Sequence, residues 1–222
     1  MTHTKRIAAG YGKTKRWVVT PNPGAHPKNR CIPLLILVRD ILGYADTSRE
    51  AKRIIHNGLI LVDKKPRKDP KYGVGLMDIV DIPKAKKHFR IMPSKKGLIP
   101  KEINEKESSI KLCRIMNKSI LGNGIIQLNL HDGGNILVNE NSYNTKDTLI
   151  LSLPEHKIID FIRFEKGNMA IIVKGRHSGK VGKIREISEG TASRRSLTKI
   201  ESLQTLTDYI FVIGREKELI SV

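Results

Sequence analysis

The chain has 222 residues, of which 39% are hydrophobic, and its 41 Lys and Arg against 22 Asp and Glu give a formal net charge of +19. Domains usually contain about 100–150 residues, so this length predicts more than one compact unit. Such a positive charge is typical of proteins that bind a polyanion, either nucleic acid or an anionic membrane surface. No stretch has the ~20 apolar residues of a membrane span, and no secretory signal pattern is present, so we expect a cytoplasmic protein that binds nucleic acid and no membrane.

The charge is unevenly distributed along the chain. Residues 1–39 hold eight Lys or Arg and no acid, and residues 84–101 hold seven and no acid. Residues 102–165 instead hold seven bases and nine acids. A single basic run is usually a solvated surface, but several runs favour surfaces that bind a polyanion, with the middle of the chain as a scaffold.

The two cysteines, Cys31 and Cys113, lie far apart in the sequence. A zinc site usually takes about four ligands that come in close pairs. We therefore expect two reduced thiols, no metal and no cofactor.

Residues 1–30 combine basic residues with glycines and prolines, and they show neither helical nor strand periodicity. Such a segment buries too little apolar surface to fold alone. We therefore expect a basic arm over residues 1–32 that orders only on its partner. Three rings in it, Tyr11, Trp17 and His26, could stack on bases or pack under the next domain.

Two helices are predicted after the arm. The apolar run 33–43 is typical of a buried helix that begins at a proline and ends at a glycine, and a second helix covers residues 48–57. Helical spacing places one set of side chains, Arg49, Lys52, Arg53 and His56, opposite another, Ala51, Ile54 and Ile55. The four potentially positive groups repel each other, a cost that phosphates across them would offset. An ordinary solvated face usually mixes both signs.

The rest of the chain is predicted to be β structure. Strands at 59–62 and 78–82 complete a helix–helix–strand unit over residues 33–88, and residues 89–166 form a central all-β domain with a hairpin at 124–138. Five or so short strands in residues 167–222 predict a small barrel. The expected fold class is α+β, built of several modules.

Two segments carry a resemblance to known families. Residues 33–82, above all segment 46–63, resemble an S-four-type RNA-binding domain. Residues 168–187 resemble a KOW motif in an SH3-like barrel, on Lys174, Gly175, Gly179, Lys180, Gly182 and Lys183. Their order, with a basic arm before them and a β domain between them, is similar to that of the archaeal and eukaryotic small-subunit ribosomal protein S-four-e family.

The resemblance to that family covers essentially the whole chain, and local stretches at 17–19, 74–78, 153–158 and 208–214 agree with it. The length is nearer to archaeal members, and the arm between Ala9 and Trp17 is shorter than is usual in the family. The resemblance implies a structural constituent of the small ribosomal subunit that binds its rRNA directly and supports assembly and translation. It also implies neighbouring ribosomal proteins as partners, met through the central domain.

Other functions fit the sequence less well. S-four-type domains also occur in pseudouridine synthases and tyrosyl-tRNA synthetases, but neither Gly-Arg pair, at 175–176 and 214–215, precedes a catalytic Asp, and no nucleotide-binding domain fits. No Walker loop, GxSxG elbow or HExxH helix is present, so we expect no enzyme. A KOW-containing transcription factor or a basic chromatin protein would not need the domain at 33–82, and co-sedimentation with ribosomes would separate these alternatives.

Most of the affinity for RNA is expected from phosphate contacts, with recognition of RNA shape rather than base edges. No catalytic residue and no metal ligand is predicted. The candidate RNA-binding residues are Lys5, Arg6, Lys13, Lys15, Arg16, Lys28, Arg30, Arg49, Lys52, Arg53, His56, Lys64, Lys65, Arg67, Lys86, Lys87, Lys174, Arg176, His177, Lys180 and Lys183. For the loop 175–182, the rival interpretation is that its glycines serve turn geometry alone.

Overall fold

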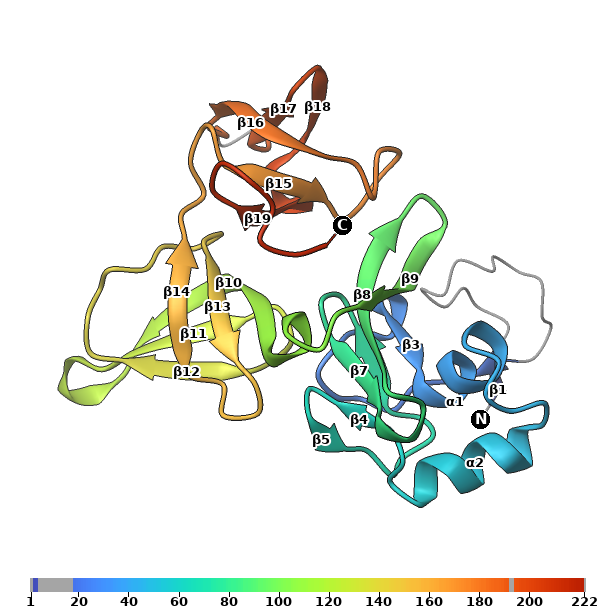
Figure 1. Cartoon of the computed structure of the whole chain (residues 1–222). Helices are drawn as coiled ribbons and strands as arrows, with labels where there is room; N and C mark the ends of the chain where they lie inside the picture. The colour runs from blue at the N-terminus through green and yellow to red at the C-terminus, as the bar shows by residue number, and fades with distance from the viewer. Residues whose placement is uncertain (1, 4–17, 192–193, 222) are drawn as a thin grey trace. The chain divides into compact units, whose positions relative to one another are not determined.

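The computed structural model describes residues 2–3, 18–191 and 194–221. Few helices and several β-sheets make up the fold (Figure 1), which confirms the predicted α+β class. The chain divides into two compact units, and neither is continuous in sequence. Unit 1 consists of Met1–Met92, Lys96–Lys111 and Ser152–His156, and unit 2 consists of Pro93–Lys95, Leu112–Leu151 and Lys157–Val222. Within the described ranges, no helix is long and apolar enough to cross a membrane.

The helices of unit 1 follow the predicted pair. The first is a continuous helical stretch of α1 (Leu34–Ile36) and the π-helical turn η2 (Leu37–Ile41), and it is almost wholly buried up to Val38. Gly43 lies in the left-handed region at φ 68°, which a glycine adopts without strain and which ends this helix. The second helix, α2 (Ser48–His56), packs against α1 through its apolar side.

The strands of unit 1 form one large and two small sheets. The large sheet has the order β5 (Lys65–Pro66), β4 (Leu61–Val62), β7 (Ile79–Ile82), β8 (Lys87–Ser94) and β9 (Gly97–Ile103). The small sheets pair β3 (Cys31–Pro33) with β6 (Gly73–Gly75), and β1 (Thr2–His3) with β2 (Val18–Val19). The sheet and the helices bury a common apolar core that includes Leu35, Ile55 and Phe89.

Residues 18–30 pack against this core, so the expectation that all of residues 1–30 order only on a partner is wrong for this part. Val18 and Val19 contact the core, and the amide N–H of Asn22 donates to the carbonyl oxygen of Lys71 at 3.0 Å. The ring of His26 is buried. These partners come from a distant part of the sequence, which a local count of apolar residues does not register.

Unit 2 contains the central sheet and the C-terminal sheet. The central sheet has the order β12 (Asn135–Val138), β11 (Ile126–Leu130), β10 (Ile110–Ile120), β13 (Thr148–Ser152) and β14 (Ile158–Ile162), around a core that includes Leu128 and Leu149. The C-terminal sheet is curled and has the order β18 (Leu203–Leu206), β17 (Leu197–Ile200), β16 (Val181–Ser188), β15 (Met169–Ile172) and β19 (Ile210–Gly214). The predicted hairpin and the short C-terminal strands are thus present.

Short 3-10 turns connect many of these elements. They are η1 (Lys28–Arg30), η3 (Pro83–Ala85), η4 (Glu107–Ser109), η5 (Gly122–Gly124) and η6 (Thr207–Tyr209). The guanidinium of Arg114 on β10 donates to the carbonyl oxygens of Asp208 at 3.0 Å and Ile210 at 2.7 Å, and it thereby ties η6 and β19 to the central sheet.

Candidate nucleic-acid interface

The helix α2 begins with a reciprocal cap. The amide N–H of Glu50 donates to the hydroxyl oxygen of Thr47 at 3.2 Å, and the carboxylate of Glu50 accepts from the amides of Thr47 at 3.3 Å and Asp46 at 3.1 Å. These backbone donors lower the pKa of Glu50. The one acid on the helix is therefore committed to the cap, and its charge sits at the end of the helix where a negative charge is stabilising.

The predicted cations lie on the exposed face of α2, opposite its apolar face. Arg49, Lys52, Arg53 and His56 are all exposed, whereas Ala51 and Ile55 are buried and Ile54 is half-buried. The structure thus confirms the predicted division of this helix into a basic and an apolar face. Among the residues that the structure describes, none of the four cations has a hydrogen bond or an ion pair with another side chain. The face is free to meet an external anion.

Most of the other described candidates are also exposed. These are Lys28, Arg30, Lys65, Lys86, Lys87, Lys174, Arg176, Lys180 and Lys183. His177 is half-buried, and the ammonium of Lys174 lies 5.3 Å from the centre of the Tyr209 ring. Gly175 lies against the same ring at φ 94°, a conformation that an L side chain rarely adopts, so turn geometry alone accounts for this glycine.

Two candidates are engaged inside the fold. The ammonium of Lys64 lies 3.1 Å from a carboxylate oxygen of the buried Asp81 and donates to the hydroxyl of Ser108 at 2.7 Å. The guanidinium of Arg67 lies over the ring of Tyr72, 4.5 Å from its centre. Their charges already have partners in unit 1, so they are weaker candidates for phosphate contact than the cations of α2. The five arm candidates Lys5, Arg6, Lys13, Lys15 and Arg16 lie outside the described residues.

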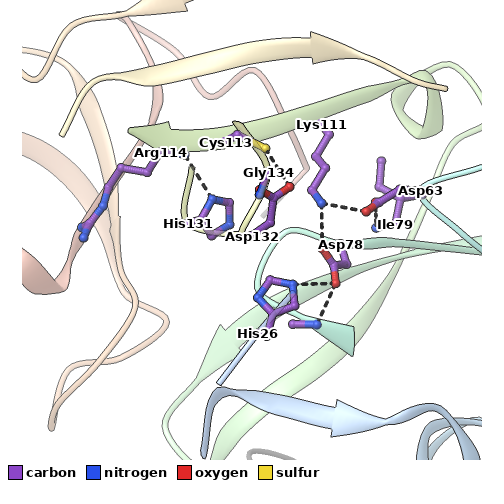
Figure 2. Close-up of polar contacts among 11 residues, drawn as sticks. His26, Asp63, Asp78, Ile79, Lys111, Cys113, Arg114, His131, Asp132 and Gly134 are labelled. Atoms are coloured by element: carbon purple, nitrogen blue, oxygen red, sulfur yellow. Dashed lines mark hydrogen bonds and ion pairs between the residues drawn. The ribbon is translucent and has the colours of Figure 1, made fainter. Parts of the chain in front are cut away.

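Unit 1 also contains a buried ionic cluster that the sequence did not predict (Figure 2). The ammonium of Lys111 donates to Asp63 at 2.7 Å and to Asp78 at 2.8 Å, and its side chain is only 1% exposed. The second oxygen of Asp78 accepts from the amide of Gly75 and lies 2.8 Å from Nε2 of His26. The carboxylate of Asp78, directly before β7, thus contacts both His26 and Lys111, near the start of β10.

The environment of this cluster moves the pKa values of its two acids in opposite directions. Burial, and next the charge of Asp78, raise the pKa of Asp63 to about 6, although Lys111 opposes the shift. Burial alone would also raise the pKa of Asp78, but the charges of Lys111 and His26 outweigh it and hold that pKa below its usual range. The cluster therefore depends on Lys111 for its charge balance.

Two further cations of the sequence are buried. Arg90 on β8, a member of the basic run 84–101, is wholly buried and donates to the carbonyl oxygens of Glu107 and Ile110, both at 2.9 Å. Burial lowers the pKa of Arg90 to about 10. Arg114, described above, is nearly as inaccessible. These residues stabilise the fold and leave the exposed lysines of the run as its only candidates for RNA contact.

The described residues offer no metal site, since no group of three or more His, Cys, Asp or Glu among them could hold an ion. Neither cysteine forms a disulfide, both are buried, and burial raises the pKa of Cys31 to about 11. The Cys31 thiol is therefore protonated, and both thiols are inaccessible.

Comparisons with known proteins agree with the resemblance to an S-four-type domain and to the S-four-e family. A model of the S4 domain matches residues 33–80, and a model described as Ribosomal family S4e matches residues 85–158. The chain is 42% identical to the small ribosomal subunit protein eS4 of Ignicoccus hospitalis, over 99% of this chain and 94% of that protein. It is 44% identical to the protein of the same name from Archaeoglobus fulgidus, over 96% of this chain and 94% of that protein.

A solved structure is similar as well. The crystal structure of the 30S ribosomal protein S4e from Thermoplasma acidophilum superimposes with a TM-score of 0.77 at 32% sequence identity, and the match covers 86% of this chain and 98% of that one.

Proposed function

Because this chain belongs to the ribosomal S4e family, we propose that it is a structural component of the small ribosomal subunit, where it binds rRNA directly and supports assembly and translation. The relatives that establish the family are named as ribosomal proteins, and the function is structural rather than enzymatic. Its place in the cell is accordingly the small subunit.

The observation that carries direct RNA binding is the basic face of α2. Four exposed, potentially positive side chains, Arg49, Lys52, Arg53 and His56, share one side of a helix whose single acid is used in its cap. Like charges at helical spacing destabilise a helix by a few tenths of a kcal/mol per pair. RNA phosphates would remove this repulsion and release counterions, so the face supports a sequence-independent contact with the RNA backbone.

The remaining exposed candidates extend this proposal to a wider RNA surface. We include Lys28, Arg30, Lys65, Lys86, Lys87, Lys174, Arg176, His177, Lys180 and Lys183 with the arm cations. We rank Lys64 and Arg67 below them because both are half-buried and have partners in the fold, whereas Lys87, which pairs with Glu102 at 3.4 Å, and Lys174 are exposed. If six to ten phosphates are neutralised, the affinity should fall by about 10³–10⁵ between 50 and 200 mM salt. A flat salt response would contradict phosphate binding.

The central β domain supports a different kind of contact. Residues 121–145, which include β11 and β12, contain no Lys or Arg in a chain with 41 of them. Lys118 of β10 contacts this segment, but its ammonium is already bonded to Asn141 at 2.8 Å. A segment without cations of its own is poorly suited to phosphates, so we propose that neighbouring ribosomal proteins meet the chain here. The division into an arm (1–32), an RNA-binding domain (33–88), a central domain (89–166) and a barrel (167–222) stays our proposal for these functional modules.

The decisive experiment replaces Arg49, Lys52 and Arg53 with Ala together. All three are exposed and away from the buried face, so the melting temperature should stay close to that of the parent. If each side chain contacts one phosphate, the slope of log affinity against log salt for an rRNA fragment should fall by roughly three units.

A matched control removes the same charge elsewhere. Lys106, Lys166 and Lys217 are exposed cations outside the predicted surface, and their triple replacement by Ala should change the slope far less. A folded α2 variant that binds rRNA as the control does would show that this face is only solvated.

A further inference from the structure

The strand β12 (Asn135–Val138) forms one edge of the central sheet in unit 2 (Figure 1). It pairs with β11 on one side, and no strand from the described part of the chain pairs with the other. We call this outer side, from Asn135 to Val138, the β12 edge.

The backbone of the β12 edge points its donors and acceptors outward at alternate residues. The amide of Leu130 donates to the carbonyl oxygen of Gly134 at 2.8 Å, which closes the hairpin, and the turn is held by Asp132, which accepts from the amide of Gly134 at 3.0 Å (Figure 2). In an antiparallel pair the ladder bonds recur at every second residue. The N–H and C=O groups of Asn135 and Leu137 therefore face away from β11.

Two side chains of the β12 edge are exposed, the polar Asn135 and the apolar Leu137, which is 60% exposed. Ile120 is 81% exposed, but it lies on β10, two strands away from β12. An isolated exposed apolar residue is ordinary, but Leu137 accompanies a row of outward backbone groups.

Two other edge strands, β5 and β14, carry features that prevent strand addition, whereas β18 (Leu203–Leu206) has neither a charge nor a proline. The edge strand β5 consists of Lys65 and Pro66, a charge and a residue without an amide hydrogen. On β14, the opposite edge of the central sheet, Asp160 forms an ion pair with Arg215, which also donates to the carbonyl oxygen of Phe161 at 3.3 Å. The β12 edge has neither a charge nor a proline.

The charge near the β12 edge indicates which partner fits. Between residues 121 and 145 the only charged side chains at neutral pH are Asp132 and Glu140, one on each side of the strand. Lys118 of β10 contacts this stretch, but its ammonium already donates to the side-chain oxygen of Asn141 at 2.8 Å. A second copy of the chain would bring the same two acids together. An extended peptide with Lys or Arg flanking its strand matches these charges.

We propose that the β12 edge accepts an extended, basic segment of a neighbouring small-subunit protein, which adds a strand to the central sheet. In this mode the main-chain hydrogen bonds supply affinity, and alternate side chains such as Leu137 supply the apolar contact. The proposal rests on the proposed function, because the subunit brings the partner segment to this edge.

Photo-crosslinking in assembled subunits tests the partner. The full chain with benzoylphenylalanine at position 137 should crosslink to a Lys- and Arg-rich peptide of another protein. The control carries benzoylphenylalanine at position 159 on β14, the opposite edge of the central sheet, where Ile159 is 58% exposed. It should not give that crosslink. A product with rRNA, with a second copy or with an acidic peptide overturns the proposal, and so does the absence of any product. If the chain does not sediment with small subunits, that result contradicts the proposed function and not strand addition alone.

Two variants of Asn135 test strand addition itself. Asn135→Pro removes one outward N–H at the first residue of the strand, where proline is tolerated, whereas Asn135→Ala keeps it. Leaving a partner carbonyl unpaired should lower the crosslink from position 137 about tenfold in the Pro variant, with little change in the Ala variant. Equal yields from both variants overturn strand addition.

Hydrogen exchange gives an independent reading without substitutions. The amide of Leu137 should exchange about tenfold or more slowly in the subunit than in the free chain, because strand pairing protects it. Unchanged exchange at this amide overturns strand addition even if a protein crosslink forms.

Discussion

Replacing Lys111 with Met tests the buried ionic cluster directly. The methionine side chain is of similar length and apolar, so it fills the space of the lysine without its charge. Asp63 and Asp78 then remain in the interior without the ammonium that lies 2.7 Å from one and 2.8 Å from the other. Breaking a buried ion pair by removal of one partner costs about 3–5 kcal/mol.

That cost is a large part of the ~5–15 kcal/mol that stabilises a typical protein. For a chain of this size, 1 kcal/mol corresponds to about 2–4 °C in melting temperature, so the variant should melt roughly 6–20 °C below the parent. The matched variant Lys106→Met changes an exposed lysine of the same unit and should stay within about 0.5 kcal/mol of the parent.

The loss in the Lys111→Met variant should depend on pH. Burial and Asp78 raise the pKa of Asp63 from 3.8 to about 6 even with Lys111 present, and removal of that cation raises it further. Since the folded-state pKa lies above the ordinary value, the stability gained by protonation is complete below about pH 3.8 and is lost as the pH rises through the folded-state value.

Thermal melts of both variants and the parent should therefore be recorded near pH 5 and near pH 8. The deficit of Lys111→Met relative to the parent should be larger at the higher pH. A deficit below about 1 kcal/mol, or one that is equal at both pH values, would refute the reasoning that Lys111 balances two buried carboxylates.

Three further predictions follow from the local geometry. Thr47→Ala removes the hydroxyl that caps α2 and should cost about 1 kcal/mol in a denaturant titration, whereas an unchanged midpoint would show that the cap contributes nothing. Ile55→Ala leaves a cavity in the core and should cost about 2–5 kcal/mol by the same assay, while the folded fraction still binds an rRNA fragment with the parent salt slope. In hydrogen exchange on the RNA-free chain, the amide of Asn22 should be protected by its bond to Lys71, and fast exchange there would contradict the packing of residues 18–30.

The parts of the fold that the sequence predicted are those with a strong local signal. The α2 face follows from helical periodicity, so Lys52 and Ile55 were placed correctly from spacing alone. The β11–β12 hairpin follows from the turn residues around Gly133.

Features that depend on distant partners were missed. Lys111 lies in an apolar alternating segment and gives no sign that its charge meets two carboxylates from other strands. Arg90 was grouped with a basic run that was expected to be exposed, but its side chain on β8 points into the interior and is buried. The hairpin of β8 and β9 was not predicted as such, because the lysines around it were interpreted only for their charge. The sequence places the charged residues along the chain, but the assignment of each charge to solvent or interior required the tertiary structure.

The discontinuity of unit 1 has a consequence for the order of events during synthesis. A nascent chain presents Asp63 and Asp78 before it presents Lys111, and the last segment of the unit, Ser152–His156, is made after most of the central sheet. Domains tend to fold in the order in which they emerge from the ribosome. Here unit 1 lacks Lys111 until translation has passed well beyond Asp63 and Asp78. Its two carboxylates must stay hydrated until then, so burial of this cluster is a late event in the maturation of the chain.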